Sequence, residues 1–343
     1  MKRLLLGLTL LTAFLIAWKV LDTHAVRVVG QPSMTGPIQS QLERPFFESL
    51  GSIPGLSFRV DYRTVDSLGF KDSHQLGMLK QGLYDMVSLR FLQNAHEEPS
   101  ILGIDLVGLN KDFDDAKKSA TAYAAVINNN LEKHYDAKLL GIWTFGPQVI
   151  MCKQKVAQLA DLKGLRVRVG SNVMLDALKS LGAIPIVVPF DQVKDAFSQN
   201  MIDCAVSSLT SGQAAGWGEF IHHIYPINLQ MGLNGIAIRA SLWNRLSDAQ
   251  QATLKQSVSL YIDQVWDYAK KLDQDAKACF EAKQACPGYS THKAEIHPVL
   301  EEDQKYLRQF ALSQSLHAWA KDCDQQRPNC SQEWKQHMME MLR

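Results

Sequence analysis

The segment 161–208 constrains the fold more than any other, because fewer than fifty residues there carry the pattern of five regular elements. Short apolar runs alternate with helical patterns, and brief polar breaks separate them. Strands that are apolar on both faces belong to a parallel sheet covered on both sides, since no wet side produces alternation. We therefore predict a βαβαβ unit, with strands at 165–169, 184–188 and 202–206 and helices at 172–181 and 190–200.

Arg168 departs from the apolar character of the first of these strands, near its carboxyl end. Ligands of open α/β sheets bind in the crevice outside the carboxyl ends of the strands. Ser207 and Ser208 stand at the corresponding end of the third strand. These three residues are candidate ligand contacts, although a structural salt bridge would also explain Arg168.

The chain before this unit carries a further set of strands and helices. A strand at 26–30 runs into a loop rich in glycine and proline at the start of a helix, a natural place for an anion. Ser33 in that loop is either a ligand contact or a helix cap. A later strand–helix–strand pattern ends in Arg90, which is either a second ligand contact or a solvated loop arginine.

Two long strand patterns carry a break in the middle. Residues 139–153 form one apolar run interrupted by Gly146 and Pro147, and residues 228–243 form another that contains two glycines. Such breaks suit crossings from one lobe to another, and two crossings joining two lobes predict a cleft between them. Gln148 and Asn234, close to the two breaks, are therefore further candidate ligand contacts.

These patterns predict an α/β protein of two lobes, which suits a chain of 343 residues. After the cap pair at 247–248, apolar residues recur at spacings of three and four, the mark of a long amphipathic helix that could span both lobes. We expect the chain to divide into five parts. These are a signal peptide at 1–25, lobe I at 26–145 with about 232–248, lobe II at 146–231, the spanning helix at 249–285, and a C-terminal helical segment at 286–343 that packs on the lobes.

The first 25 residues have the pattern of an export signal. Lys2 and Arg3 precede an apolar run at 4–18, and a polar stretch follows that ends in Thr23, His24 and Ala25, after which we expect cleavage. An uncleaved anchor is the alternative, but the apolar run is shorter than the roughly 20 residues that a spanning helix needs. Either way, the body of the protein is expected outside the cytoplasm, in the periplasm if the signal is removed.

Cysteine spacing agrees with an oxidising compartment. Two pairs share one spacing, Cys279 with Cys286 and Cys323 with Cys330, and turn-forming residues lie in or beside both intervals. Local disulfides are therefore expected, with free surface thiols as the alternative and a zinc site as a weaker one. Two further cysteines, at positions 152 and 204, stand inside apolar strand patterns and are predicted to be small core residues.

The sequence contains no established catalytic motif. HExxH, GxSxG, a Walker loop and a strand-associated GxGxxG are all absent from the sequence. The ten histidines are scattered, and we predict that His222 and His223 are structural residues of a surface helix. Paired carboxylates such as Asp66 with Asp72, or Glu97 with Glu98, fit solvated loops. No metal, cofactor or catalytic residue is predicted, and a net charge of +1 gives no basic field for nucleic acid.

The amino-acid sequence of the 161–208 unit resembles that of a known protein family. The runs DLKGLRVRV and LGAIPIVVPFDQVKDAFSQNMIDCAVSS are similar to those of the solute-binding proteins of tripartite ATP-independent periplasmic (TRAP) transporters, the DctP-like family. The likeness extends over about 26–300. It implies a two-lobed periplasmic-binding-protein type II fold that acts as a monomer, captures an organic acid and delivers it to the transporter's membrane subunits.

The resemblance also implies roles for particular residues. The arginine of the corresponding strand pairs with the substrate carboxylate in that family, and Arg168 occupies its position. A planar guanidinium matches a carboxylate through a fixed fork, which lysine does not provide. Gln148 stands near the place of a second cation, so a monocarboxylate fits better than a dicarboxylate. A sensory binding protein without a transporter and, less favoured, a secreted enzyme are the alternatives.

Overall fold

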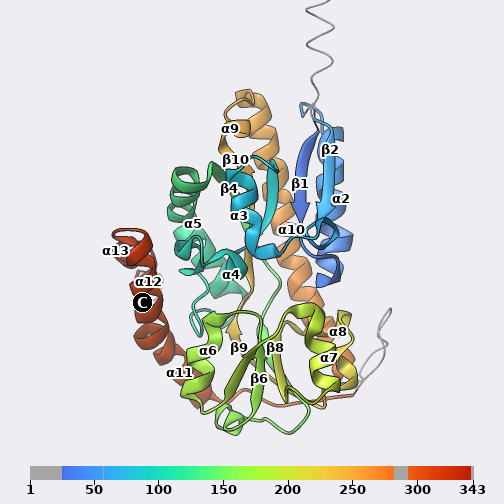
Figure 1. The fold of residues 1–343 in the computed structure, drawn as a ribbon, viewed down its shortest axis with the longest axis vertical. Helices are drawn as coiled ribbons and strands as arrows, with labels where there is room; N and C mark the ends of the chain where they lie inside the picture. Colours follow the sequence, from blue (N-terminus) through green and yellow to red (C-terminus); the bar gives the residue numbers. More distant parts are fainter. Residues whose placement is uncertain (1–24, 57, 282–292, 341–343) are drawn as a thin grey trace, which may run out of the picture.

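The computed structural model describes residues 25–56, 58–281 and 293–340. These residues form two β-sheets, each flanked by helices, that lie one beyond the other along the long axis of the molecule (Figure 1). The predicted signal segment lies outside the described residues except for Ala25. None of the described helices combines the length and the apolar character that crossing a bilayer requires.

The first sheet has five strands in the order β2-β1-β3-β10-β4. Strands β1, β2 and β3 are parallel, and β10 runs antiparallel to both β3 and β4. We call this sheet and its helices the first lobe. Its elements are β1 (Val26–Gly30), α2 (Arg44–Ser49), β2 (Val60–Thr64), α3 (Gln75–Lys80), β3 (Met86–Arg90), α4 (Phe91–Asn94), α5 (Phe113–Tyr135), β4 (Ala137–Thr144), β10 (Leu233–Arg239) and α9 (Ala240–Trp243).

The second sheet has six strands in the order β11-β9-β5-β8-β6-β7, and with its helices it forms the second lobe. Strands β6, β7 and β8 are parallel, as the apolar runs predict, while β5 is antiparallel to β8 and β9. The elements are β5 (Gln148–Cys152), β6 (Arg166–Val169), α6 (Leu175–Ser180), β7 (Ile184–Val187), α7 (Val193–Ser198), β8 (Cys204–Ser207), α8 (Leu209–Ala214), β9 (His223–Gln230) and β11 (Glu295–Ile296).

Both predicted crossings are present. Strands β4 and β5 are consecutive in the chain but belong to different sheets, and so are β9 and β10. The second break occurs at Gly232, whose φ of 62° lies in the left-handed region that favours glycine. The crossings are tied together, because the Thr144 hydroxyl donates to the Met231 carbonyl at 2.5 Å and the Phe145 amide donates to Gly232 at 3.2 Å.

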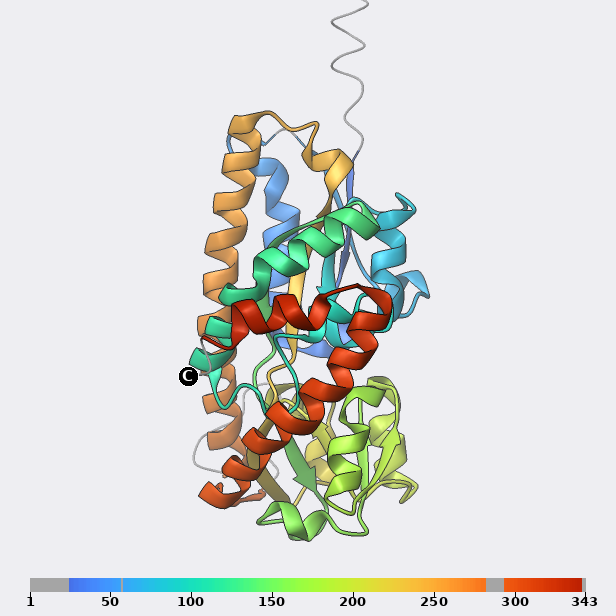
Figure 2. The same cartoon turned by 90° about the vertical axis from the view of Figure 1, so that its left-hand side faces the viewer.

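A single helix, α10 (Asp248–Phe280), runs along both lobes (Figures 1 and 2). It begins at a capping box formed by Ser247 and Gln250, which satisfies two terminal N–H groups. Val258 and Val265 pack in the core beside the first sheet, whereas Phe280 packs in a core of the second. The spanning helix is thus observed, and it ends at Phe280.

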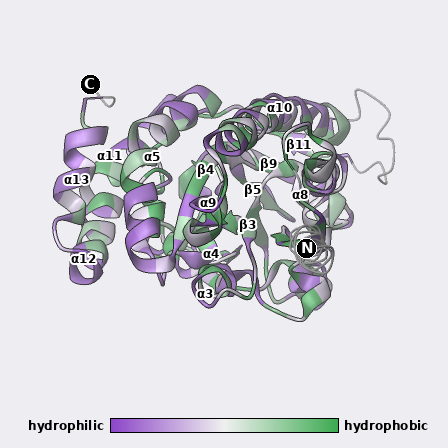
Figure 3. Ribbon diagram, turned by 90° about the horizontal axis from the view of Figure 1, so that it is seen from above, coloured by the Kyte–Doolittle hydropathy of each residue, from purple (hydrophilic) through white to green (hydrophobic). Residues whose placement is uncertain are grey.

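The C-terminal helices cross from the second lobe back to the first. Their bounds are α11 (Glu301–Phe310), α12 (Leu316–Gln326) and α13 (Cys330–Met338). Phe310 packs in a core of the second lobe, while Trp319 and Trp334 pack in the main core of the first. They lie beside α5, with hydrophilic residues on their outer faces (Figure 3). Glu98, expected in a solvated loop, is fully buried and pairs with Arg327 at 2.8 Å, which ties this segment down.

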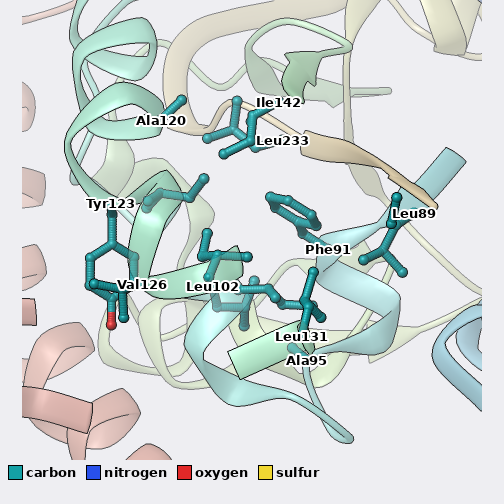
Figure 4. Close-up of a cluster of buried hydrophobic side chains, with 14 of the residues drawn as sticks. Leu89, Phe91, Ala95, Leu102, Ala120, Tyr123, Val126, Leu131, Ile142 and Leu233 are labelled. Carbon is teal, nitrogen blue, oxygen red and sulfur yellow. The ribbon is translucent and has the colours of Figure 1, made fainter. Parts of the chain in front are cut away.

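The main core of the first lobe surrounds α5 (Figure 4). Tyr123 and Leu131 on α5, Ile142 on β4 and Phe91 on α4 belong to this core, and all four are at most 6% exposed. Phe91 and Leu139 approach Gly235 on β10 so closely that a Cβ there would lie under 3 Å from both. The first-lobe end of the second crossing is therefore closely packed.

The cysteines correct one prediction. Cys152 and Cys204 form a disulfide, because β5 and β8 place them directly opposite each other with their Cα atoms 4.0 Å apart. The predicted bond between Cys323 and Cys330 is confirmed. Cys279 is disulfide-bonded, but Cys286, its predicted partner, lies outside the described residues.

Candidate functional site

The carboxyl ends of strands from both sheets meet at the boundary between the lobes. Strand β3 is antiparallel to β10 and pairs Arg90 with Asn234, so β3 ends where β10 enters the first lobe. Strand β8 is antiparallel to β5 and pairs Ser207 with Val149, so β8 ends where β5 enters the second lobe. Strand β6 runs parallel to β8. This edge is where ligands of open α/β sheets bind.

Arg168 is the central feature of this boundary. Its side chain is buried, with 4% of the residue exposed, and none of the described carboxylates pairs with it. Nε donates to the carbonyl of Val188 at 2.9 Å, and Nη1 donates to that of Val206 at 3.2 Å. Three of the five guanidinium N–H donors are left for a ligand.

No carboxylate in the described part of the chain compensates the charge of Arg168. Burial lowers the pKa of Arg168 to about 9, and the positive charge of Arg90 adds to the effect. The group still carries its proton at neutral pH, since that pKa lies above 7. A buried cation without a partner is costly, so the arrangement favours an anion that comes from outside the chain.

Two aromatic rings hold the guanidinium in place. The Cζ atom of Arg168 lies 5.9 Å from the ring centroid of Phe190 and 5.7 Å from that of Trp217. Phe190 follows β7 and precedes α7, while Trp217 is fully buried after α8. Cation–π contacts at this range favour the charged form and restrict how the guanidinium can turn. They also place apolar surface beside the anchor.

Arg90 is a second cation at the boundary, but it already has a partner. Its Nη1 donates to Asp72 at 2.8 Å, and both side chains are largely buried. Nε of Arg90 is buried without a hydrogen-bond partner among the described residues. Asp72 was expected to be a solvated loop carboxylate, whereas the structure uses it to neutralise Arg90. The site therefore holds two guanidinium groups and one internal counter-charge.

Three of the other predicted residues lie at the boundary in different states. Ser207 ends β8, and its hydroxyl has no hydrogen-bond partner within the described part of the chain. Asn234 is buried at the start of β10 and donates to the Gly232 carbonyl at 2.7 Å. Gln148 donates to the Gly146 carbonyl at 2.9 Å. Ser207 is thus the most available of the three for a ligand.

The remaining two predicted residues are engaged elsewhere. Ser208 caps α8 by accepting from the Ser211 amide at 3.2 Å. Ser33 is exposed, and its hydroxyl donates to Asp66 at 2.5 Å. Ser211 in turn donates to the Thr35 carbonyl at 3.4 Å, so α8 of the second lobe contacts the loop after β1 of the first. A ligand role for Ser33 and Ser208 stays a prediction.

A buried carboxyl group supports the first-lobe side of the boundary. Glu43 is fully buried and accepts hydrogen bonds from the Gln31 amide at 2.7 Å, the Ser88 hydroxyl at 2.5 Å and the Tyr62 hydroxyl at 2.8 Å. Burial nevertheless raises the pKa of Glu43 to about 7. The cluster fixes the carboxyl ends of β1 and β3, next to Arg90.

Glu43→Gln is expected to change how stability depends on pH. The unfolded carboxyl titrates near 4.5 and the folded one near 7, so the folded state holds the proton longer. Stability from this group is therefore complete below pH 4.5 and falls by about 3 kcal/mol as pH rises to 7. Urea unfolding between pH 4.5 and 7.5 should show wild type losing stability relative to Glu43→Gln. Glu48→Gln, an exposed change on α2, is the control, and parallel curves for wild type and Glu43→Gln would contradict the prediction.

Asp105 holds the second crossing in place. Its carboxylate is buried and accepts from the backbone amides of Met231 at 2.7 Å and Leu233 at 3.2 Å. Burial raises the pKa of Asp105 to about 6. These bonds satisfy amides on either side of Gly232, where the chain passes between the lobes. The crossing is therefore pinned on the first-lobe side by one side chain.

Several residues of the site were not identified from the sequence. Phe190 was assigned only as a helix start, and Trp217 carried no signal beyond its apolar character. Gln31 and Glu43 were also missed, although Gln31 directly follows β1, and the strand-end rule applied to Arg168 would have indicated it. Glu43 lies in a helical segment and gave no comparable signal.

Comparisons with known proteins bear on this arrangement. The family model of the bacterial extracellular solute-binding proteins of family 7, DctP, matches residues 64–314. A Haemophilus influenzae protein named only as uncharacterized is 29% identical over 244 residues, which cover 70% of this chain and 73% of that relative.

Two solved structures share the fold. An extracytoplasmic solute receptor of Bordetella pertussis that binds pyroglutamic acid has a TM-score of 0.76 at 17% identity, covering 92% of this chain and 99% of its own. A TRAP periplasmic solute binding protein of Rhodoferax ferrireducens with bound malonate gives the same four values. At such identities the likeness shows the fold alone, and it confirms the predicted two-lobed architecture.

Proposed function

Because the chain belongs to family 7 of the bacterial extracellular solute-binding proteins, the DctP family of TRAP transporters, we propose that it captures an organic acid between its lobes and delivers it to the membrane subunits of such a transporter. The observation that carries this proposal is Arg168, a buried guanidinium that none of the described carboxylates neutralises. A carboxylate at its three remaining donors supplies the missing charge and the missing acceptors.

The proposed ligand is a monocarboxylate with an apolar or aromatic body. Of the two guanidinium groups at the boundary, Asp72 already neutralises Arg90, whereas no described carboxylate neutralises Arg168. Phe190 and Trp217 stand beside the anchor and offer apolar surface rather than a second positive charge. Pyroglutamic acid, bound by the Bordetella pertussis relative, is a monocarboxylate, although malonate in the Rhodoferax ferrireducens relative carries two carboxylates.

The proposed working state is a monomer in the periplasm whose lobes close on the ligand. The crossings at Gly146 and Gly232 are the hinges, because both glycines adopt positive φ and join the two sheets. The contact between Ser211 and Thr35 joins the lobes at the boundary. The role is binding and delivery rather than catalysis, in keeping with a family of solute receptors.

Calorimetry tests the ligand class with matched pairs of acids, such as butyrate with succinate and benzoate with phthalate. Wild type should bind the monocarboxylate of a pair more tightly. Asp72→Asn frees Arg90 and should shift the preference toward the dicarboxylate by about tenfold, which equals about 1.4 kcal/mol. Asp61→Asn, whose partner is the exposed Arg63, is the control and should leave the preference unchanged.

A wild-type preference for dicarboxylates, or an unchanged preference in Asp72→Asn, would contradict the proposed ligand class. Uptake of the tightest ligand into spheroplasts that carry the membrane subunits tests delivery. Transport should require the added protein. Equal transport without the added protein would contradict the proposed delivery to the transporter, whereas the proposed binding of an organic acid would still stand.

A further inference from the structure

A cluster of two histidines and one glutamate lies at the outer edge of the second sheet. Strand β11 pairs with β9 in parallel, with Glu295 opposite His223. Side chains alternate along a strand, so Glu295 and His297 share the face that carries His223. The cluster is at the far end of β9 from the lobe boundary, about 20 Å from it along the strand. It is therefore separate from the Arg168 site.

The donor atoms of the three side chains converge. His223 Nδ1 lies 3.2 Å from His297 Nε2 and 3.5 Å from one Glu295 oxygen, while the other oxygen lies 3.6 Å from His297 Nδ1. One donor atom from each residue lies within 4.8 Å of the other two. Two donors bound to one tetrahedral zinc ion at 2.0–2.1 Å lie about 3.3 Å apart. The His223–His297 pair at 3.2 Å and the His223–Glu295 pair at 3.5 Å are close to that spacing, and the third pair, within 4.8 Å, closes when the three groups bind one ion.

We propose that His223, Glu295 and His297 bind one divalent transition-metal ion, Zn²⁺ in the first instance. Two imidazoles and one carboxylate form a ligand set that suits zinc. The His297 side chain is 5% exposed and that of Glu295 is 61% exposed, so the site is anchored on one side and open to solvent on the other. A water molecule completes the coordination on the open side.

The alternative occupant of the cluster is a proton shared between the two rings. The imidazoles are stacked with centroids 5.4 Å apart and an interplanar angle of 15°, and a hydrogen bond between Nδ1 and Nε2 satisfies both. That arrangement leaves the Glu295 carboxylate at 3.5 and 3.6 Å from imidazole nitrogens, longer than a normal hydrogen bond. A metal ion brings all three groups to one centre.

The position of the site gives the ion a structural consequence. Strand β11 has two residues and opens the C-terminal segment that continues into α11, α12 and α13. Its attachment to β9 consists of few backbone bonds, among them those from Glu295 to His222 and from His297 to Ile224. A metal ion that bridges β9 and β11 cross-links this segment to the second sheet.

Titration of the full-length mature protein without a histidine tag with Zn²⁺ tests the proposal. Wild type should bind one ion per chain with a Kd of about 10 μM or tighter, and saturating Zn²⁺ should raise Tm by about 2 °C or more. His223→Ala and Glu295→Gln should each weaken binding at least tenfold. His222→Ala is the matched control on the adjacent residue and should bind as wild type does.

Two results would overturn the metal site: no saturable binding at 100 μM Zn²⁺, or binding that survives both ligand variants. Glu295→Gln is an exposed change, so a folded protein is available even if a variant at the buried His297 fails to fold. The affinity of Glu295→Gln for an organic acid should equal that of wild type. This readout separates failure of the metal site from failure of the carboxylate site.

Discussion

Arg168→Met is expected to lower the affinity for the bound organic acid by at least 100-fold, which equals about 3 kcal/mol. The ligand carboxylate then enters a buried site without the charged, hydrogen-bonded partner that offsets its desolvation. Arg168→Lys should also lose affinity, because an ammonium group retains the charge but lacks the planar fork. Isothermal calorimetry of both variants against the tightest ligand measures the loss.

The same substitution should raise the thermal stability of the ligand-free protein. Met has a similar volume and removes a buried cation that no described carboxylate neutralises. If Arg168 were a structural residue, Arg168→Met would lower Tm and leave affinity intact. Arg166→Gln is the matched control on the same strand, because Arg166 is held by Asp203 at 2.9 and 2.6 Å and should not affect binding.

Removing the disulfide between Cys152 and Cys204 is expected to be the largest single loss of stability in the second lobe. The bond joins residues 52 apart in sequence, so the double substitution to alanine should cost about 4 kcal/mol of unfolding free energy through the entropy of the unfolded chain. Urea unfolding under non-reducing conditions measures the loss.

The pair Cys323 and Cys330 provides an internal comparison. This disulfide joins residues only 7 apart, and the same loop-entropy relation gives about 2.5 kcal/mol for its removal. Alanine variants of the two pairs should therefore differ by about 1.5 kcal/mol. An equal or smaller loss at Cys152 and Cys204 would show that chain entropy does not explain the contribution of that bond.

The local sequence pattern was sufficient to predict the βαβαβ elements of the second lobe. The strands β6, β7 and β8 and the helices between them agree with the predicted segments to within a few residues, because apolar runs, polar breaks and glycines act over short distances. The main difference is that both helices open with a short 3₁₀ turn, at Asn172–Met174 and Phe190–Gln192. The two crossings were likewise visible as breaks in long apolar strands.

The surface helix expected at His222 and His223 was wrong for a physical reason. His223 begins β9, an edge-side strand that pairs with β5 and β11 rather than a surface helix. The apolar residues around it form a short run at 220–227 whose pattern does not separate strand from helix, so pairing partners far away in the chain decide its conformation. The approach of His297 to His223 follows from that pairing.

Part of the candidate site could likewise be predicted from the sequence, and part depends on the tertiary structure. Arg168 was recognisable from the sequence, because a strand-end position and a fork-shaped cation are properties of one short segment. Its lack of a counter-ion, the rings of Phe190 and Trp217 beside it, and the capture of Arg90 by Asp72 all depend on contacts between separate segments. The periodicity of apolar residues determines the conformation of each short segment. Burial, charge pairing and the Cys152–Cys204 bond arise only when distant strands pair in their final register.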